Sequence, residues 1–351
     1  MKRILFIDRE QFGTLTDTLK YCEHLHETYK IDYISFDRKE PRIKVPNVHS
    51  VYIPFIGPKV LRGLLLIFYS IIRCLFYNGF IYIVYFPKCS LIQKILFWKK
   101  MHVDVRTLSV SRFSNIREKE NKKLNKEINV FSSVSFISEG IRNQLTLKKN
   151  IKTYILPLGA DVISETNKDF SSLKLLYIGS LTNRDIIKTV IGVKQFRETY
   201  PTISLVYDIV GAGTEYNEIK DYINQAKLMD CIHLYGKIPY PQLKPFLDSH
   251  NIGISFVPIT DYFNFQPPTK TFEYALSGLY IIATKTKANE QVVDENNGML
   301  ISDTAKDFSS AIYNIYQKRN FLDSKIIRGS MKPFLWKNII DDYFKPIIEN
   351  K

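Results

Sequence analysis

Short apolar runs and amphipathic stretches alternate along most of this 351-residue sequence, and that alternation restricts the possible folds more than any other feature. Arg3–Ile7 and Lys30–Phe36 have the character of strands, and Asp17–Tyr29 between them has helical periodicity. The same order returns later, where the strand-like runs Leu173–Gly179 and Ser204–Gly211 flank a helical segment. Strand–helix–strand units of this kind predict parallel sheets covered by helices on both faces.

The polar stretch Gly159–Ser172 separates two such series and is the natural linker. We therefore expect an α/β protein with two doubly wound, Rossmann-like domains, residues 1–160 and 161–330, facing each other across a cleft. The final segment, residues 331–351, contains the amphipathic stretch Phe334–Lys351, which we expect to form a helix that crosses back to the N-terminal domain.

The formal net charge of +14 favours polyanionic partners, namely nucleic acid, anionic lipid headgroups or phosphorylated small molecules, although a lysine-rich solubilising surface explains it equally well. Nucleic acid is not expected, because the sequence has no basic motif rich in aromatic residues. The four cysteines are far apart and no HExxH motif occurs, so we expect no metal or other cofactor and a reducing, cytoplasmic location.

The segment Lys59–Phe86 is the most apolar part of the sequence. The apolar run between Arg62 and Arg73 is too short to span a bilayer, and Asn78-Gly79 would divide the rest into a helix and a strand. Two interpretations stay open. One is a buried helix followed by a core strand, and the other is a basic, apolar helix on the inner surface of an anionic membrane.

The stretch PPTKTFEYALSG, Pro267–Gly278, is the strongest candidate for a binding site. Proline suits a first helical turn, because a helix leaves that N–H unpaired anyway. The amides of Thr269, Lys270 and Thr271 should then be free to bind an anion beside the Lys270 ammonium. One turn on, the carboxylate of Glu273 can accept hydrogen bonds from a ribose. The pattern favours a nucleotide, and the alternative is an ordinary Lys–Glu surface pair.

Two further loops follow strands of the second half. Gly211-Ala212-Gly213 precedes a helix as phosphate-binding turns do, but Tyr216 stands where a dinucleotide fingerprint has its third glycine, so a plain turn is the alternative. After Gly179, the cations of Arg184 and Lys188 lie near a helix start, which is unfavourable unless an anion is bound there. We take Arg184 as functional and Lys188 as a solvated helix residue.

The order and spacing of these blocks over residues 173–301 resemble the retaining family-4 glycosyltransferases of GT-B fold, and N-terminal blocks such as MKRILFID and ILPLGAD are similar to those of bacterial members. The resemblance implies a hexosyltransferase-type enzyme. It would move a sugar from a UDP- or GDP-sugar to a glycan or lipid-linked glycan in capsule or lipopolysaccharide synthesis, without a metal.

The resemblance also implies roles for residues in the donor site. Gly13 would lie in the loop that faces the donor diphosphate, and the backbone of Gly236, Lys237 and Ile238 would read the nucleobase. At the diphosphate clamp the sequence departs from the family's pattern. Ser180 stands at the arginine position and Asp185 at the lysine position, so Arg184 would take over the clamp.

Glu273 matches the second of the family's paired glutamates, which binds ribose, whereas Phe265 stands at the first, which contacts the donor sugar. Lys270 would be a phosphate ligand and, with Arg184, a catalytic residue. Arg106 occupies the region of a histidine near the reacting sugar, and Glu139 would face the acceptor; we count both as catalytic candidates.

Two other functions stay open. A non-catalytic GT-B protein that binds a glycan or a partner would explain Phe265 and the altered clamp. A nucleotide-dependent dehydrogenase is disfavoured, because the first strand–helix turn, DREQFGTLTD, lacks the GxGxxG pattern.

Overall fold

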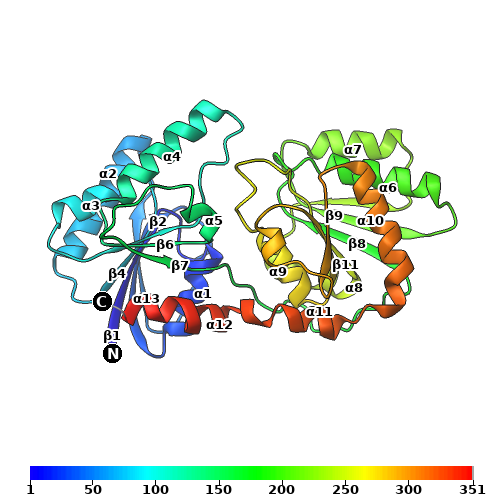
Figure 1. Ribbon diagram of the computed structural model, residues 1–351. Coiled ribbons are helices and arrows are strands. Elements are labelled where there is room, and N and C mark those ends of the chain that lie inside the picture. The colour runs from blue at the N-terminus through cyan, green and yellow to red at the C-terminus, as the bar shows by residue number, and fades with distance from the viewer. Residues whose placement is uncertain (350–351) are drawn as a thin grey trace. The chain divides into compact units, whose positions relative to one another are not determined.

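The computed structural model describes residues 1–349, which divide into two compact units. Unit 1 consists of Met1–Leu158 together with the C-terminal segment that begins at Trp336, and unit 2 consists of Gly159–Leu335 (Figure 1). The divisions fall at 158/159 and 335/336, where the sequence suggested 160/161 and 330/331.

Unit 1 is built on a seven-stranded parallel sheet with the order β3-β2-β1-β4-β5-β6-β7. The strands are β1 (Lys2–Ile7), β2 (Tyr29–Asp37), β3 (Val48–Pro54), β4 (Phe80–Val84), β5 (His102–Val105), β6 (Ser133–Phe136) and β7 (Lys152–Ile155). The chain runs outward from β1 in one direction and then from β4 in the other, which is the doubly wound order.

The helices of unit 1 cover this sheet. They are α1 (Thr16–Leu25), α2 (Lys59–Leu75), α3 (Ser90–Ile95), α4 (Ser114–Ile128), α5 (Glu139–Arg142), α12 (Trp336–Ile339) and α13 (Lys345–Glu349), the last two joined by a π-helical turn over Ile340–Phe344. The C-terminal helix therefore begins at Trp336 and not at Phe334, which ends a 3₁₀ turn. Residues 350–351 of the expected helix lie outside the described residues.

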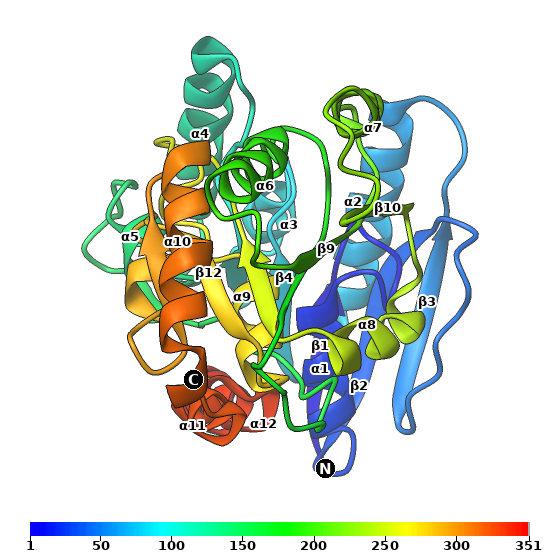
Figure 2. The same ribbon diagram turned by 90° about the vertical axis from the view of Figure 1, so that its right-hand side faces the viewer.

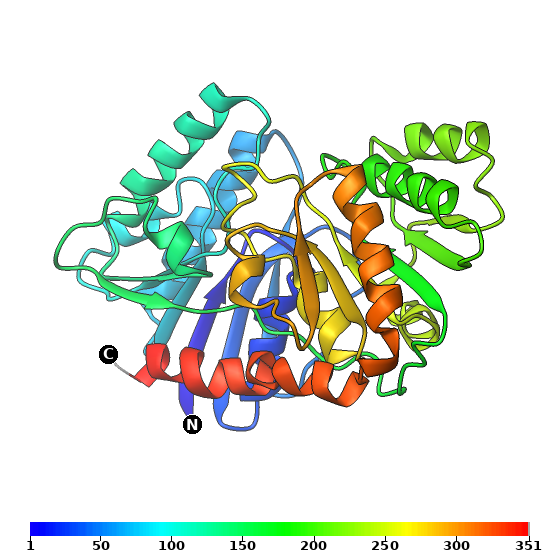
Figure 3. The same cartoon turned by 45° about the vertical axis from the view of Figure 1, so that its right-hand side comes forward.

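The C-terminal helix belongs to the core of unit 1. Phe344 stacks on Tyr21 of α1 with ring centres 4.2 Å apart and contacts Phe6 of β1 at 6.1 Å. Glu349 accepts a hydrogen bond from Tyr29 at 3.3 Å. Figure 3 shows this red helix beside the beginning of β1. The amphipathic pattern at the end of the sequence is thus explained by burial against the first strands of unit 1.

Unit 2 contains a six-stranded parallel sheet with the order β10-β9-β8-β11-β12-β13. The strands are β8 (Leu173–Ile178), β9 (Leu205–Val210), β10 (Ile232–Gly236), β11 (Ile252–Ser255), β12 (Tyr280–Thr284) and β13 (Gly298–Ile301). The helices are α6 (Ile187–Thr199), α7 (Tyr216–Gln225), α8 (Lys244–Ser249), α9 (Thr269–Leu276), α10 (Ala305–Lys318) and α11 (Ser324–Ser330). The expectation of two Rossmann-like α/β units with parallel sheets is confirmed.

Helices α6 and α10 pack against each other in unit 2 (Figure 2). Gly192 permits this close approach, since a Cβ there would lie 2.7 Å from the carbonyl oxygen of Ala305. Thr304 caps α10 by accepting a hydrogen bond from the amide of Asp307. Helix α10 was not expected from the sequence, although the Thr304 cap and the apolar Phe308 and Ile312, which are buried, mark it.

Helix α2 carries a second apolar face on the outside of unit 1. Only four of its residues are buried, namely Leu66, Ile67, Ser70 and Cys74. The exposed large apolar side chains of α2 and of the residue after it, here called the α2 face, are Val60, Leu61, Leu64, Phe68, Tyr69, Ile72, Leu75 and Phe76. A buried helix is therefore wrong for this segment, whereas the core strand expected after it is present as β4. Among residues 1–349, none of the helices has the length and apolar character needed to cross a bilayer.

Candidate functional site

Helix α9 begins at the expected place in unit 2. Pro268 precedes it with extended backbone angles, φ −72° and ψ 125°. Within residues 1–349 the amides of Thr269 and Lys270 make no hydrogen bond, as the proline-led start predicts. Two donors at a helix N-terminus, where the helix dipole is positive, favour an anion at this point.

The expectation of a third free amide, at Thr271, is wrong. That amide donates to the carbonyl of Pro268 at 3.1 Å. The buried Thr271 hydroxyl shares a hydrogen bond with Ser255 of β11 at 2.6 Å and donates to Asn289 at 3.2 Å. Thr271 therefore anchors the start of α9 to the sheet, because its donors and acceptors are all used inside the unit.

Lys270 has the most unusual environment of the candidate residues. Its ammonium nitrogen is buried and makes no hydrogen bond within residues 1–349, and it lies 3.7 Å from the centre of the Tyr177 ring. Gly179 leaves room for it, since a Cβ there would be 2.6 Å from the same nitrogen. Burial, and then the nearby Arg184 guanidinium, lower the pKa of Lys270 well below its usual value, while Glu273 opposes this shift. An anion bound here would supply the missing partner.

Arg184 lies in the loop between β8 and α6. Its neighbours Asn183 and Asp185 both adopt left-handed backbone angles, with φ of 57° and 53°. The guanidinium lies over the Phe263 ring at 4.3 Å, and the Arg184 amide donates to Glu215 at 3.2 Å. The loop thus holds the Arg184 side chain on the side of the unit where Lys270 lies, near enough for the two cations to repel each other.

Two other residues in and next to this loop have internal partners: Ser180 in the loop and Lys188 in the first turn of α6. Lys188 forms an ion pair with Asp185 at 3.0 Å, so it stabilises the loop, in agreement with a role outside the site. The exposed Ser180 accepts a hydrogen bond from the amide of Thr182 through its hydroxyl at 3.1 Å, and its carbonyl accepts one from Tyr177 at 2.7 Å.

Gly211 and Gly213 follow β9, as the sequence suggested. A Cβ on Gly211 would lie 1.9 Å from the carbonyl oxygen of Gly179, and one on Gly213 would lie 2.4 Å from the backbone of Leu181. These glycines are therefore required by the close packing of two loops. This agrees with the alternative that the sequence left open, a structural turn rather than a phosphate-binding one. By this packing they fix the loop that carries Arg184.

Glu273 lies one turn into α9. It accepts a hydrogen bond from the hydroxyl of Tyr240 at 3.2 Å. Burial raises the pKa of Glu273 to about 7, against the effect of the Tyr240 hydrogen bond and the Lys270 charge. A simple Lys–Glu surface pair does not describe this arrangement, because the Lys270 ammonium lies against Tyr177 and Glu273 is held by Tyr240.

The expected base-reading segment follows β10. Gly236 has a left-handed φ of 70°, which only glycine adopts readily, and its carbonyl accepts from the Gly211 amide at 2.8 Å. Lys237 is exposed and Ile238 is half-buried. The 3₁₀ turn that contains Tyr240 comes directly after them. Through the hydrogen bond from Tyr240, this segment contacts Glu273 of α9.

Three aromatic residues of this region were missed by the sequence analysis. Tyr177 lies under Lys270, Phe263 lies under Arg184 and Tyr240 binds Glu273. The positions of Tyr177, two residues before Gly179, and of Phe263, in the aromatic loop before α9, were visible signals. Phe265 lies in that loop, half-buried, so no carboxylate occupies its position eight residues before Glu273.

The other candidates, Gly13, Arg106 and Glu139, belong to unit 1. Gly13 has a left-handed φ of 95°. The guanidinium of Arg106 forms an ion pair with Asp17 and donates to the carbonyl of Leu156 at 2.8 Å, so it links α1 to the end of β7. Glu139 is exposed at the start of α5 and pairs with Arg142 at 3.1 Å. Their catalytic roles stay predictions.

Comparison with known proteins agrees with this geometry. Residues 172–318 match the family model described as "Glycosyl transferases group 1". No curated protein sequence matches the chain. Among solved structures, sucrose-phosphate synthase from Thermosynechococcus elongatus superposes with a TM-score of 0.78 at 15% identity, covering 100% of both chains.

Two further solved structures are similar over almost the whole chain. Anabaena HepE, in a complex with UDP-glucose, has a TM-score of 0.76 at 13% identity, with 99% of each chain covered. The lipopolysaccharide outer core galactosyltransferase WaaB has a TM-score of 0.71 at 14% identity, again with 99% of each covered. At these identities the likeness concerns the fold. The two Rossmann-like units have the GT-B fold of these solved structures, and the match to the group 1 glycosyltransferase family model is confined to residues 172–318.

Proposed function

We propose that the protein is a glycosyltransferase that moves a sugar from a nucleotide-sugar, a UDP- or GDP-sugar, to a glycan or lipid-linked acceptor. One observation carries this proposal. The buried Lys270 ammonium has no hydrogen-bond partner within residues 1–349, at a helix start with two unused amides and beside Arg184. A diphosphate satisfies all of these donors at once. The complex of HepE with UDP-glucose makes a UDP-sugar the first donor to test.

The proposed mechanism is electrostatic. When the bond between the anomeric carbon and the diphosphate oxygen breaks, negative charge develops on the leaving phosphate. Lys270, Arg184 and the Thr269 and Lys270 amides would stabilise that charge, and they need no metal to do so. Glu273 would hold the ribose, and the backbone of 236–238 the nucleobase. The acceptor hydroxyl would pass its proton to the departing phosphate, with retention of configuration.

We also propose that the enzyme works at the cytoplasmic surface of a membrane, on a glycan of capsule or lipopolysaccharide type. The α2 face supports this. It presents apolar side chains over the length of α2, and that helix contains no acidic residue. Lys59 and Arg62 lie at its start, whereas Arg73 near its end forms an ion pair with Asp32 at 3.1 Å. Apolar side chains next to cations fit an anionic lipid surface. The apolar side chains enter the headgroup region, and the cations remain near the phosphates.

The donor assignment is tested by thermal shift with UDP, GDP, CMP and ADP, followed by assays of donor hydrolysis and transfer. A glycosyltransferase is stabilised by UDP or GDP and releases the nucleotide in the presence of an acceptor, and chelation of metals with EDTA leaves the rate unchanged. The altered residues Ser180, Asp185 and Phe265 favour a second candidate, a non-catalytic binding protein. That candidate would bind the nucleotide but never hydrolyse or transfer from its sugar conjugate.

A further inference from the structure

Unit 1 contains a cavity of about 350 Å³ whose lining includes none of the candidate site residues. Phe80, His102, Ser133 and Lys152 line it, and each is the first residue of its strand, β4, β5, β6 or β7. His102, Ser133 and Lys152 are direct neighbours across the sheet. The cavity therefore opens at the amino-terminal edge of the sheet. Arg106 follows the opposite end of β5, about 13 Å away along the strand at ~3.3 Å per residue.

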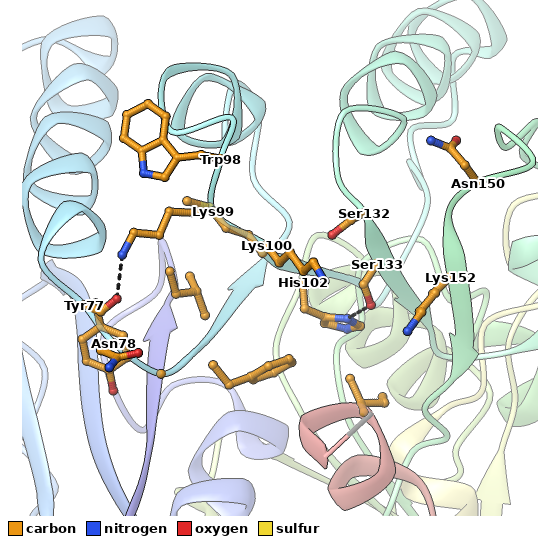
Figure 4. Close-up of a pocket in the computed structure, with 15 residues that line it drawn as sticks. Tyr77, Asn78, Trp98, Lys99, Lys100, His102, Ser132, Ser133, Asn150 and Lys152 are labelled. Atoms are coloured by element: carbon orange, nitrogen blue, oxygen red, sulfur yellow. Dashed lines mark hydrogen bonds between the residues drawn. The ribbon is translucent and has the colours of Figure 1, made fainter. Parts of the chain in front are cut away.

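The lining of this edge pocket carries positive charge only. It includes Lys99, Lys100 and Lys152, and it contains no aspartate or glutamate. Lys99 donates to the carbonyl of Tyr77 at 2.8 Å, which leaves its other protons available. The side chains of Lys100 and Lys152 make no hydrogen bond or ion pair to any of residues 1–349. Figure 4 shows Lys99 and Lys152 on opposite walls. Such a lining favours an anion, and ammonium groups bind phosphate well as point charges.

His102 forms part of the floor of the pocket and is not a free acid or base. Its Nδ1 shares a hydrogen bond with Ser133 at 2.7 Å and its Nε2 with Ser135 at 2.8 Å. Burial lowers the pKa of His102 to about 3, so the ring is neutral. The anion-binding capacity of the pocket therefore comes from the lysines, with Asn78, Ser132 and Asn150 as neutral polar groups of the lining.

Two lining residues of the pocket are direct sequence neighbours of exposed aromatic residues. Tyr77 lines the pocket and directly follows Phe76 of the α2 face, which is 82% exposed. Trp98 also lines it, 57% exposed, and directly follows Phe97, which is 78% exposed. Aromatic side chains that are apolar at one end and polar at the other are typical of the headgroup level of a membrane. A ligand of this pocket would thus present its phosphate at that level.

We propose that the edge pocket binds the glycerophosphate headgroup of an anionic phospholipid, with Lys100 and Lys152 as its phosphate ligands and Trp98 at the lipid–water boundary. This inference rests on the membrane association proposed above. It adds a defined headgroup site to a general attraction between a basic, apolar face and lipid. The site lies at the sheet edge opposite to the candidate residues Gly13, Arg106 and Glu139, which follow β1, β5 and β6.

The test is a calorimetric titration of the full chain with dihexanoyl phosphatidylglycerol, a short-chain lipid used below the concentration at which it forms micelles. Wild-type protein should bind it saturably, and the fluorescence of Trp98 should change; the other tryptophan, Trp336, is buried. The variant Lys100→Ala/Lys152→Ala should bind roughly 10- to 30-fold more weakly, from about 1 kcal/mol per lysine. The matched control, Lys122→Ala/Lys123→Ala on α4, removes the same charge from exposed positions and should stay within about twofold of wild type.

Three results of the lipid titrations would overturn the inference. One is a flat wild-type titration, the second is equal weakening by the pocket and control variants, and the third is equal affinity for the zwitterionic dihexanoyl phosphatidylcholine. Glycerol 3-phosphate identifies the source of the phosphate. If it binds as tightly as the lipid, the ligand is a soluble phosphoester and the lipid assignment is wrong. UDP thermal shifts on the same variants separate the two proposals. If the pocket variant loses lipid binding but keeps the UDP shift, the substitution acts on the pocket alone. If wild type shows no UDP shift, the donor site is refuted and the lipid proposal is not.

Discussion

The ammonium nitrogen of Lys270 lies 3.7 Å from the centre of the Tyr177 ring, buried and without a hydrogen bond to any of residues 1–349. A contact with an aromatic face offsets only part of the cost of removing an ammonium group from water. A buried polar group without a partner is rare in native structures, and a bound ligand that completes its environment is one physical explanation. This relationship links the fold of unit 2 to the proposed binding of a diphosphate.

The pH dependence of nucleotide binding tests Glu273. Its pKa is raised from 4.5 to about 7 in the folded protein, mainly by burial, so the carboxyl group is mostly protonated at pH 6 and mostly ionised at pH 8. An ionised carboxylate is the better acceptor for ribose hydroxyls. UDP should therefore bind more tightly than its 2′,3′-dideoxy analogue. The ratio of the two affinities should be about threefold or more larger at pH 8 than at pH 6. Calorimetry at the two pH values measures this ratio.

The variant Glu273→Gln is the control for this experiment, and its preference for UDP should not change with pH. The same group affects stability with a defined sign. Because its folded pKa is raised, the folded state binds more protons than the unfolded state between pH 4.5 and about 7. Its contribution to the free energy of unfolding is thus lost as the pH rises through 7. In the Glu273→Gln variant this pH-dependent decrease in stability should be absent. A pH-independent ratio in wild type would remove Glu273 from the ribose site.

Arg184, on the loop before α6, and Lys188, in the first turn of α6, form a matched pair of cations. Arg184→Ala should weaken UDP binding about 10- to 100-fold, since one charge-assisted hydrogen bond is worth about 1.5–3 kcal/mol, and should leave binding of uridine unchanged. Lys188→Ala breaks the ion pair with Asp185 and should change UDP affinity by less than about threefold. Equal effects of the two substitutions would mean that the loop acts through general charge and that Arg184 is not the clamp.

The α2 face is tested with vesicles. Leu64→Ser/Phe68→Ser removes two exposed apolar side chains and should weaken cosedimentation with vesicles containing phosphatidylglycerol about tenfold or more, with the UDP thermal shift retained. Phe321→Ser is the control, because Phe321 is also a large apolar residue, is even more exposed than Leu64 and Phe68, and lies in unit 2. If wild-type protein is a dimer that this double substitution makes monomeric, the face is an interface between copies, and the membrane assignment is wrong.

The sequence was sufficient to predict the elements whose patterns are local. The strand series, the proline-led start of α9 and the loop after β8 are all present close to the expected residues. Hydrophobic periodicity and proline geometry determine these features within a few residues of chain. The existence of two parallel-sheet units follows from the same alternation.

What the sequence could not show depends on contacts between distant segments. Gly211 is required because Gly179 approaches it, and Thr271 is occupied because Ser255 and Asn289 lie beside it. The second apolar face of α2 was ambiguous, since an apolar helix has the same pattern whether its outer face is buried or exposed. The edge pocket joins the starts of four strands, and no local pattern marks such a place.

The most direct test of the central claim compares wild type with Lys270→Met by thermal unfolding with and without UDP. Methionine fills the same space without a charge, so the ligand-free variant should unfold at the same or a higher temperature than wild type. Saturating UDP should raise the Tm of wild type clearly more than that of the variant, and donor turnover should fall about 100-fold or more. A variant that is less stable without ligand and keeps the full UDP shift would show that Lys270 is a structural residue, which contradicts the proposed donor site.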